Sequence, residues 1–266
     1  MRKMIEVFDL VRSFGPHKAV DGITFDVDPG EVFGLVGPNG AGKTTTIRML
    51  TTLLRPTQGR GVIGGYDIVR QAREVRRLIG YVPQMLSVDG SLTGYENLLF
   101  FARLYDVPSG ECHERIRHML ALLDLDHAAD SLVRTYSGGM IRRLEIGQAM
   151  LHRPRVLFLD EPTVGLDPMA RRSVWDHIKN LRATYNTTIL VTTHYMDEVE
   201  SVCDRLAIMH LGKISAVGTP EELKRQVGRD NATLEDAFAY FTGSTMETGG
   251  TLRDTLRVRR TARRLG

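Results

Sequence analysis

Cysteine is scarce in this 266-residue sequence, and its two copies, Cys112 and Cys203, stand far apart. Neither has the close spacing of metal ligands, and two such distant residues imply no disulfide framework. We therefore expect two buried thiols in a protein of a reducing compartment.

Long apolar runs are lacking as well. No run approaches the roughly 20 residues that a membrane helix needs. No apolar signal-peptide segment follows the basic start at Arg2 and Lys3. These absences predict a cytosolic protein that does not cross a bilayer by itself.

The chain also lacks an excess of basic residues outside its C-terminal tail. Its formal net charge is +3, but six arginines against Asp254 give the last 16 residues +5, which leaves about −2 for the rest. This distribution argues against a nucleic-acid-binding body. We interpret the arginine-rich tail as solvated. The alternative is contact with anionic lipid, at about 1 kcal/mol per basic residue near a charged surface.

Apolar strands alternate with amphipathic helices through most of the chain, which is typical of an α/β fold with a parallel sheet covered on both faces. A β-hairpin precedes this pattern, and a helical insert of about 65 residues, near 85–150, interrupts it. The expected strands are residues 4–9, 20–27, 32–36, 61–63, 79–82, 156–159, 189–192, 205–210 and 213–218. The expected helices are residues 46–54, 97–105 (opened by a capping box at Thr93 and Glu96), 112–123, 169–182, 196–203 and 221–241.

The chain is organised around a glycine-rich stretch that reads Gly37-Pro38-Asn39-Gly40-Ala41-Gly42-Lys43-Thr44-Thr45. A strand, then G-x-x-x-x-G-K-T, then a helix indicates a phosphate-binding loop. The glycines let successive N–H groups point at phosphate oxygens, and the helix start adds its own donors and dipole. Lys43 would reach the β- and γ-phosphates, and Thr44 would ligate Mg²⁺. The alternative is a turn that only connects the strand to the helix.

Two acidic residues, Asp160 and Glu161, end the apolar strand at 156–159. A carboxylate delivered beside a phosphate loop supplies a second Mg²⁺ ligand, which predicts that role for Asp160. Glu161 would orient the attacking water or take its proton. His194 ends another strand. Because the chain also carries a phosphate loop and an acidic pair, we favour contact of His194 with the γ-phosphate over a histidine that only hydrogen-bonds within the core.

A second anion-binding turn, Tyr136-Ser137-Gly138-Gly139-Met140, opens an amphipathic helix. A single ATP has one triphosphate, so two phosphate cradles in one chain favour two chains closed around each nucleotide. Gln84, at a strand end, can bind Mg²⁺ or water and report occupancy to the helical insert. Phe14 could stack on a base or fill the core.

Six motifs, in this order, are similar to those of ABC-type ATPases. They are the Walker A loop at 37–45, the Q-loop at Gln84, the signature Ser137-Gly138-Gly139, the Walker B residues Asp160-Glu161-Pro162, the D-loop Gly165-Leu166-Asp167 and the H-loop His194. The resemblance covers about residues 4–227. It implies a P-loop NTPase fold with a RecA-like core, an antiparallel β subdomain and an inserted helical subdomain. It also implies an ATPase domain of residues 1–230, with a C-terminal helix, linker and tail in 231–266. Its cofactors would be ATP and Mg²⁺, and Asp167 would join the nucleotide contacts.

Several stretches further resemble the daunorubicin-resistance type of ABC-2 exporter subunits. They are residues 86–89, 92–98, 135–140, 165–168 and, after the ATPase domain, 233–243. This resemblance implies a separate membrane subunit, a second copy in a nucleotide sandwich, and a place at the cytoplasmic face of the membrane. Some relatives carry glutamine at the H-loop position, whereas this chain keeps His194. Its signature departs from the commonest form at Tyr136 and Met140.

The alternative interpretation is a soluble ABC ATPase that acts on ribosomes or DNA. Such translation factors carry two cassettes, and the DNA-repair kind inserts long coiled coils, but this chain has one cassette and no sustained heptad repeat. A nucleotide-binding regulator without turnover is disfavoured because Glu161 and His194 are both present. The sequence does not identify the exported substrate, which could be a drug, lipid, polysaccharide or peptide.

Overall fold

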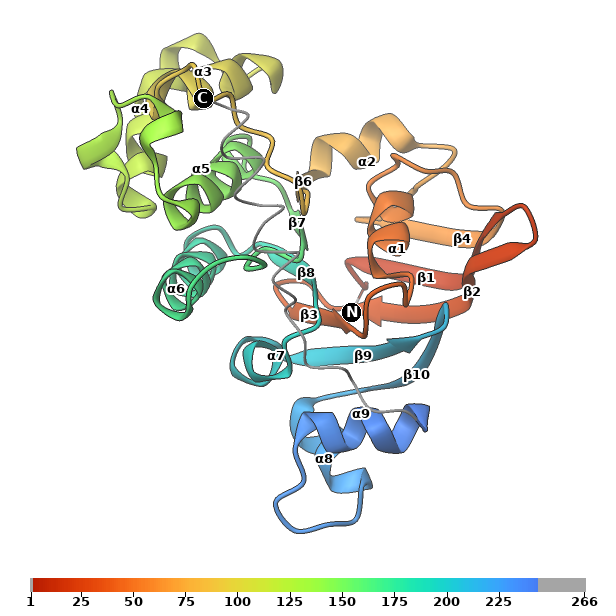
Figure 1. Cartoon of the computed structure of the whole chain (residues 1–266). Helices are drawn as coiled ribbons and strands as arrows, with labels where there is room; N and C mark the ends of the chain where they lie inside the picture. The colour runs from red at the N-terminus through yellow and green to blue at the C-terminus, as the bar shows by residue number, and fades with distance from the viewer. Residues whose placement is uncertain (1, 244–266) are drawn as a thin grey trace. The chain divides into compact units, whose positions relative to one another are not determined.

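The computed structural model describes residues 2–243 (Figure 1). The chain divides into two compact units. Within the described residues, the first unit holds the segments up to Tyr81, Arg155–Glu161 and Thr187 onward, and the second holds Val82–Pro154 and Pro162–Asn186. The predicted linker at 242–251, apart from its first two residues, and the arginine-rich tail lie outside the described residues.

A four-stranded antiparallel sheet begins the first unit. Its order is β2-β1-β4-β5. The strands are β1 (Ile5–Phe14), β2 (His17–Val27), β4 (Gln58–Ile63) and β5 (Tyr66–Asp67). The predicted hairpin is present, but its strands are longer than residues 4–9 and 20–27. Pairing continues through irregular registers to Phe14 opposite His17, so backbone hydrogen bonds extend the strands beyond the apolar pattern.

A six-stranded sheet forms the core of the first unit, in the order β10-β9-β3-β8-β7-β6. The strands are β3 (Val32–Val36), β6 (Ile79–Val82), β7 (Val156–Asp160), β8 (Thr188–Thr193), β9 (Arg205–His210) and β10 (Lys213–Gly218). Strand β3 runs parallel to β8 and β9, and β7 runs parallel to β8. Every residue of β3, β7 and β8 is buried, as expected for strands covered on both faces. The edge strand β10 is antiparallel to β9, so the sheet is mixed.

The helices of the first unit are α1 (Lys43–Leu50), α2 (Ala72–Leu78), α7 (Met196–Val202), α8 (Pro220–Gln226) and α9 (Leu234–Thr242). The prediction of one helix over 221–241 was wrong. Gly228 and Asn231 have φ values of 74° and 59°, and this left-handed backbone ends a helix. Capping boxes at Thr219 and Thr233 then start α8 and α9 separately.

The second unit is helical. Its helices are α3 (Gly94–Leu104), α4 (Ser109–Leu122), α5 (Gly138–Met150) and α6 (Pro168–Tyr185), with short 3₁₀ turns η1 (Asp126–Ala128) and η2 (Val133–Thr135). The capping box of Thr93 and Glu96 is confirmed, although α3 begins at Gly94. The predicted apolar stripe of α4 is buried, as are Cys112 and Cys203. Among the described residues, no helix combines the length and the apolar character that crossing a membrane requires.

Candidate nucleotide and hydrolysis site

The glycine-rich loop lies between β3 and α1, as predicted, and its backbone needs glycine at particular points. Gly42 caps α1 with a φ of 106°, and Gly40 has a φ of 83°. A Cβ at Gly37 would collide with the backbone carbonyl oxygen of Met209 on β9, and one at Gly42 with that of Ala19. The loop is therefore pressed against two strands of the first unit, and this holds its curled backbone in place.

The Lys43 side chain folds back over this loop. Its Nζ donates hydrogen bonds to the carbonyl oxygens of Gly37 at 2.8 Å and Pro38 at 3.1 Å. The same Nζ lies 3.2 Å from Glu161 Oε1. Lys43 is only 4% exposed, so the ammonium group is held where phosphate oxygens would meet the loop amides.

Asp160 ends β7 beside the first residues of α1. Its Oδ1 accepts hydrogen bonds from Thr44 Oγ1 at 3.0 Å and from Thr192 Oγ1 at 2.7 Å. Burial raises the pKa of the Asp160 carboxyl above its ordinary value of 3.8, and the Glu161 carboxylate adds to the rise, while Thr192, Thr44 and Lys43 oppose it. A divalent cation would relieve this cost, and a carboxylate beside hydroxyl oxygens is the donor set that Mg²⁺ takes in nucleotide sites.

Glu161 follows directly, and its backbone is strained. Its φ is 50°, a left-handed conformation that costs a non-glycine residue of order 1–3 kcal/mol. The Glu161 N–H donates to Thr192 O and to Thr192 Oγ1, both at 3.0 Å. Its Oε2 lies 3.3 Å from His194 Nδ1, beyond the end of β8. Hydrogen bonds to the neighbouring strand β8 thus hold Glu161 in this strained conformation. In this conformation its carboxylate faces Lys43 and His194.

The charge state of Glu161 suits proton transfer. Burial by itself would raise its pKa, but the His194 hydrogen bond and the Lys43 charge outweigh burial, and the pKa lies below its ordinary value of 4.5. Glu161 is therefore ionised at neutral pH, which a general base requires. We call Lys43, Thr44, Asp160, Glu161 and His194 the Lys43 cluster, and all five lie in the first unit.

Thr192 was missed by the sequence analysis. It connects both acidic residues, because its hydroxyl donates to Asp160 and accepts from Glu161 N–H. A threonine inside the apolar run of β8 was a visible signal. Its partner was not visible, because Asp160 is placed opposite Thr192 only by the register of β7 and β8.

The second predicted anion-binding turn lies in the second unit, at the start of α5. The Ser137 Oγ accepts a hydrogen bond from Met140 N at 3.3 Å and so caps the helix. Ser137 and Gly138 are exposed. A Cβ at Gly138 would stand 3.2 Å from Leu166 Cδ2, and one at Gly139 would stand 3.1 Å from Ala170 Cβ. The 165–167 turn therefore lies beside the Ser137 turn within this unit.

Asp167 and Gln84 also belong to the second unit. Asp167 caps α6, where its Oδ1 accepts from Ala170 N at 2.9 Å. Gln84 is exposed on the loop after β6. Their contacts with nucleotide stay predictions.

The unusual signature residue Tyr136 has a structural reason. Its hydroxyl donates to Ala128 O at 2.6 Å, and the ring is buried. A Cβ at Gly94 would collide with this hydroxyl. Tyrosine at 136 and glycine at 94 therefore fit each other.

Phe14 is the last residue of β1 and is 48% exposed, so the alternative of a core position was wrong. The Arg12 guanidinium lies over its ring, 4.5 Å from the ring centroid. About half of the side chain is exposed beside this contact, and base contact by Phe14 stays a prediction.

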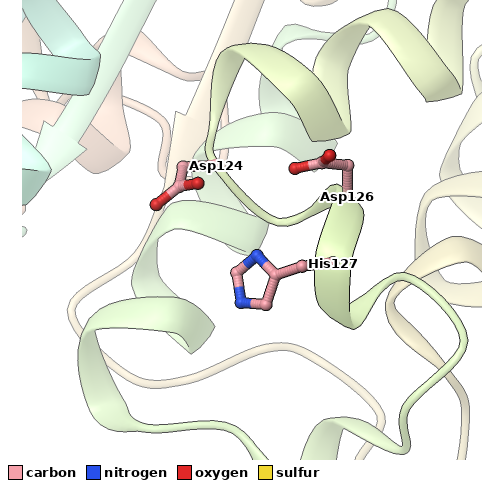
Figure 2. A group of neighbouring side chains, drawn as sticks. All are labelled: Asp124, Asp126 and His127. Atoms are coloured by element: carbon pink, nitrogen blue, oxygen red, sulfur yellow. The ribbon is translucent and has the colours of Figure 1, made fainter.

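One group of possible metal ligands in the second unit was not predicted. Figure 2 shows Asp124, Asp126 and His127 around the turn from α4 into η1, with ligand atoms within 4.8 Å of one another. All three are exposed, and Asp124 also lies 3.5 Å from Arg143. Exposed acidic groups are common without an ion, so we assign no site here.

Comparison with known proteins points in one direction. The family described as ABC transporter matches residues 20–164. The daunorubicin/doxorubicin resistance ATP-binding protein of Streptomyces peucetius is 45% identical over 226 residues, which cover 85% of this chain and 68% of that protein. The Nod factor export ATP-binding protein I of Burkholderia lata is 40% identical over 257 residues, covering 93% and 84%. A solved ATP-binding subunit of an ABC transporter superposes with a TM-score of 0.79 at 32% identity, covering 90% of this chain and 99% of that one.

Proposed function

The chain belongs to the ABC transporter family, among the ATP-binding subunits of ABC-2 type exporters that hydrolyse ATP for transport, and on that premise we propose that the Lys43 cluster performs the hydrolysis. One observation carries this assignment. A buried, ionised Glu161 lies between Lys43 Nζ at 3.2 Å and His194 Nδ1 at 3.3 Å. We set aside the alternative of a soluble ABC ATPase that acts on ribosomes or DNA, because the relatives are named as transport and resistance proteins.

The phosphates of ATP would bind the amides of residues 37–45, with Lys43 on the β- and γ-phosphates. Lys43 now bonds two loop carbonyls and Glu161, so it exchanges these partners for phosphate oxygens. Thr44 and Asp160 would hold Mg²⁺, which supplies charge neutralisation for the phosphoryl group when bound. Their mutual hydrogen bond supports the pairing.

Glu161 would take the proton of the attacking water as the water oxygen bonds to the γ-phosphorus and the bond to the bridging oxygen breaks. The released ADP carries the electron pair of that bond. His194 would keep Glu161 and the γ-phosphate in line, which agrees with its distance to the carboxylate. Lys43 would stabilise the charge that develops on the phosphoryl oxygens.

The exposed Ser137 turn would close on the γ-phosphate held by a second copy of the chain. Its exposed serine, whose hydroxyl can still donate while it caps α5, its glycines and the adjacent Asp167 cap support this role. Gln84 would contact Mg²⁺ or the attacking water.

Subunits of this family work with a membrane permease. For this chain we propose a separate ABC-2 type membrane subunit, which would place it at the cytoplasmic face of the membrane. Two relatives are named for drug resistance and for Nod factor export, so we assign the choice of substrate to the membrane subunit. A pull-down that recovers a polytopic membrane protein would support this, and recovery of ribosomes or DNA would contradict it.

We also keep anionic lipid contact by residues 252–266 as a proposal. Flotation with vesicles that contain anionic lipid tests it, and unchanged recovery after deletion of these residues would contradict it.

Hydrolysis itself is tested on the purified chain. Phosphate release from ATP should require Mg²⁺ and stop when the ion is chelated. It should rise more steeply than the protein concentration, because two copies form each site. A chain that binds ATP without any turnover would contradict the proposal.

A further inference from the structure

A buried ion pair on α5 holds the loop that carries Gln84. The loop of residues 83–87 leads from β6 toward α3, and α5 is the helix that the Ser137 turn opens. Arg142 and Glu145 of α5 are 3% and 2% exposed. All of these residues belong to the second unit, and none of the expected catalytic roles uses the pair.

Arg142 binds the first part of the loop through its backbone. Its Nη1 donates to Pro83 O at 2.8 Å, and its Nη2 donates to Gln84 O at 3.1 Å. A guanidinium presents its donors in a fixed fork, so two bonds to successive carbonyls set both the position and the direction of the chain. Arg142 thus holds the backbone of Gln84 and leaves its side chain exposed.

Glu145 binds the other end of the loop. Its Oε1 accepts hydrogen bonds from Ser87 N at 2.5 Å and from Ser87 Oγ at 3.1 Å, and its Oε2 lies 3.0 Å from Arg142 Nη1. Burial raises the pKa of the Glu145 carboxyl, while Arg142 and the two Ser87 bonds oppose that rise. The two side chains together hold three backbone groups of one short loop.

Stability alone is a weak reason for such a pair. Burying two charges is costly, and a pair of apolar side chains of similar volume is often as stable or more stable. The geometry offers another reason. Arg142 and Glu145 lie about one and two helical turns beyond Gly138, so the Gln84 loop and the Ser137 turn are attached to one helix.

We propose that Arg142 and Glu145 are positioning residues that fasten the loop of Gln84 to α5, so that the loop and the Ser137 turn move as one body. The inference rests on the proposed function, in which both segments serve ATP. Any displacement of Gln84 when nucleotide binds is then transmitted through the guanidinium and the carboxylate to the Ser137 turn.

The first measurement is amide hydrogen exchange of the full-length chain over residues 83–88. The double variant Arg142→Met with Glu145→Leu removes both charges together, so no lone buried charge opposes folding. Fluorescence of Trp175, the one tryptophan of the sequence, verifies the fold. Exchange in this loop should become about 10-fold faster, since the Ser87 amide loses a charge-assisted bond.

The matched control is Arg143→Gln. Arg143 is the next residue on α5 and also donates to a backbone carbonyl, Leu123 O at 2.7 Å, but this bond lies away from the loop. The variant therefore loses a bond of the same kind, and we expect exchange over residues 83–88 to match the wild type.

The second measurement is ATP turnover per folded molecule. In the double variant, ATP binding should stay within about twofold, because the Lys43 cluster is untouched, and turnover should fall about 10-fold. The single variant Glu145→Gln keeps Arg142 and an oxygen that accepts from Ser87 N. Compared with the double variant, it should therefore show slow loop exchange again and most of the wild-type turnover. Rescue by glutamine but not by leucine would show that the acceptor bond matters.

The outcomes separate the two proposals. A folded double variant with unchanged loop exchange, or with faster exchange but normal turnover, would overturn the positioning role and leave the proposed function standing. A wild-type chain without turnover would overturn the proposed function, and the exchange data would then decide alone whether the loop is fastened to α5.

Discussion

Lys43 Nζ and Glu161 Oε1 lie 3.2 Å apart, and both side chains are almost completely buried. The lysine expected to bind phosphate is thus neutralised by the carboxylate expected to activate water. Since a buried charge is costly without a partner, each residue keeps the other in place until phosphate oxygens compete for the lysine. Binding of ATP would therefore release Glu161 for proton transfer.

Replacing Glu161 by glutamine should keep ATP binding and lower turnover by about 10²–10⁴-fold, the usual contribution of a general base. Glutamine keeps the shape of the side chain and one oxygen that can accept from Lys43 Nζ, but it cannot take a proton from water, so the loss is chemical. Steady-state phosphate release and nucleotide binding by equilibrium dialysis measure the two effects. Normal turnover in this variant would remove Glu161 from the base role.

Ser137→Arg should abolish hydrolysis that depends on two copies while leaving ATP binding to the monomer unchanged. The Ser137 turn is exposed and lies in the second unit, whereas the phosphate loop belongs to the first. A bulky cation there would block closure onto a neighbouring copy. Sedimentation with ATP, using the slow Glu161→Gln background, should show dimers that the added arginine prevents. Hydrolysis at the normal rate would rule out the two-chain site.

Asp160→Asn should raise the free energy of unfolding without nucleotide and should abolish Mg²⁺-dependent turnover. The gain arises because the folded protein raises the pKa of Asp160 above 3.8, mainly through burial, so the ionised carboxylate costs stability. This cost is complete above the raised pKa and vanishes as the pH falls below the unfolded value. The difference in stability between variant and wild type should therefore be largest near neutral pH and disappear toward about pH 4. Urea unfolding at several pH values measures it, and a gain that grows on acidification would contradict the sign.

Gly37→Ala should remove ATP binding, and destabilise the first unit by a few kcal/mol, because its Cβ would collide with the Met209 carbonyl. Gly40→Ala is the matched control in the same loop. Open space surrounds Gly40, and only its φ of 83° opposes alanine, at about 1–2 kcal/mol. Thermal unfolding and nucleotide binding should rank the two variants in this order. Equal effects would show that the close approach of β9 is unimportant.

The structure confirms several elements that were predicted from residues close together in the sequence. The strand before Gly37, the capping box at Thr93 and the apolar stripe of α4 depend on signals within a few positions of each other. The single helix expected over 221–241 failed for the complementary reason, since Gly228 and Asn231 interrupt a pattern that hydrophobicity alone continues.

For the candidate site, too, some features could be predicted from the sequence and others depended on the tertiary structure. The amino-acid sequence by itself determined the kinds of group present, namely a phosphate loop, two carboxylates at a strand end and a histidine at another. Only the tertiary structure decided that Thr192 holds both carboxylates, that Glu161 adopts a φ of 50°, and that Lys43 pairs with a residue 118 positions away. Local signals act through the chain's own geometry, whereas these contacts depend on strand order and register, which bring distant residues to one edge of the sheet.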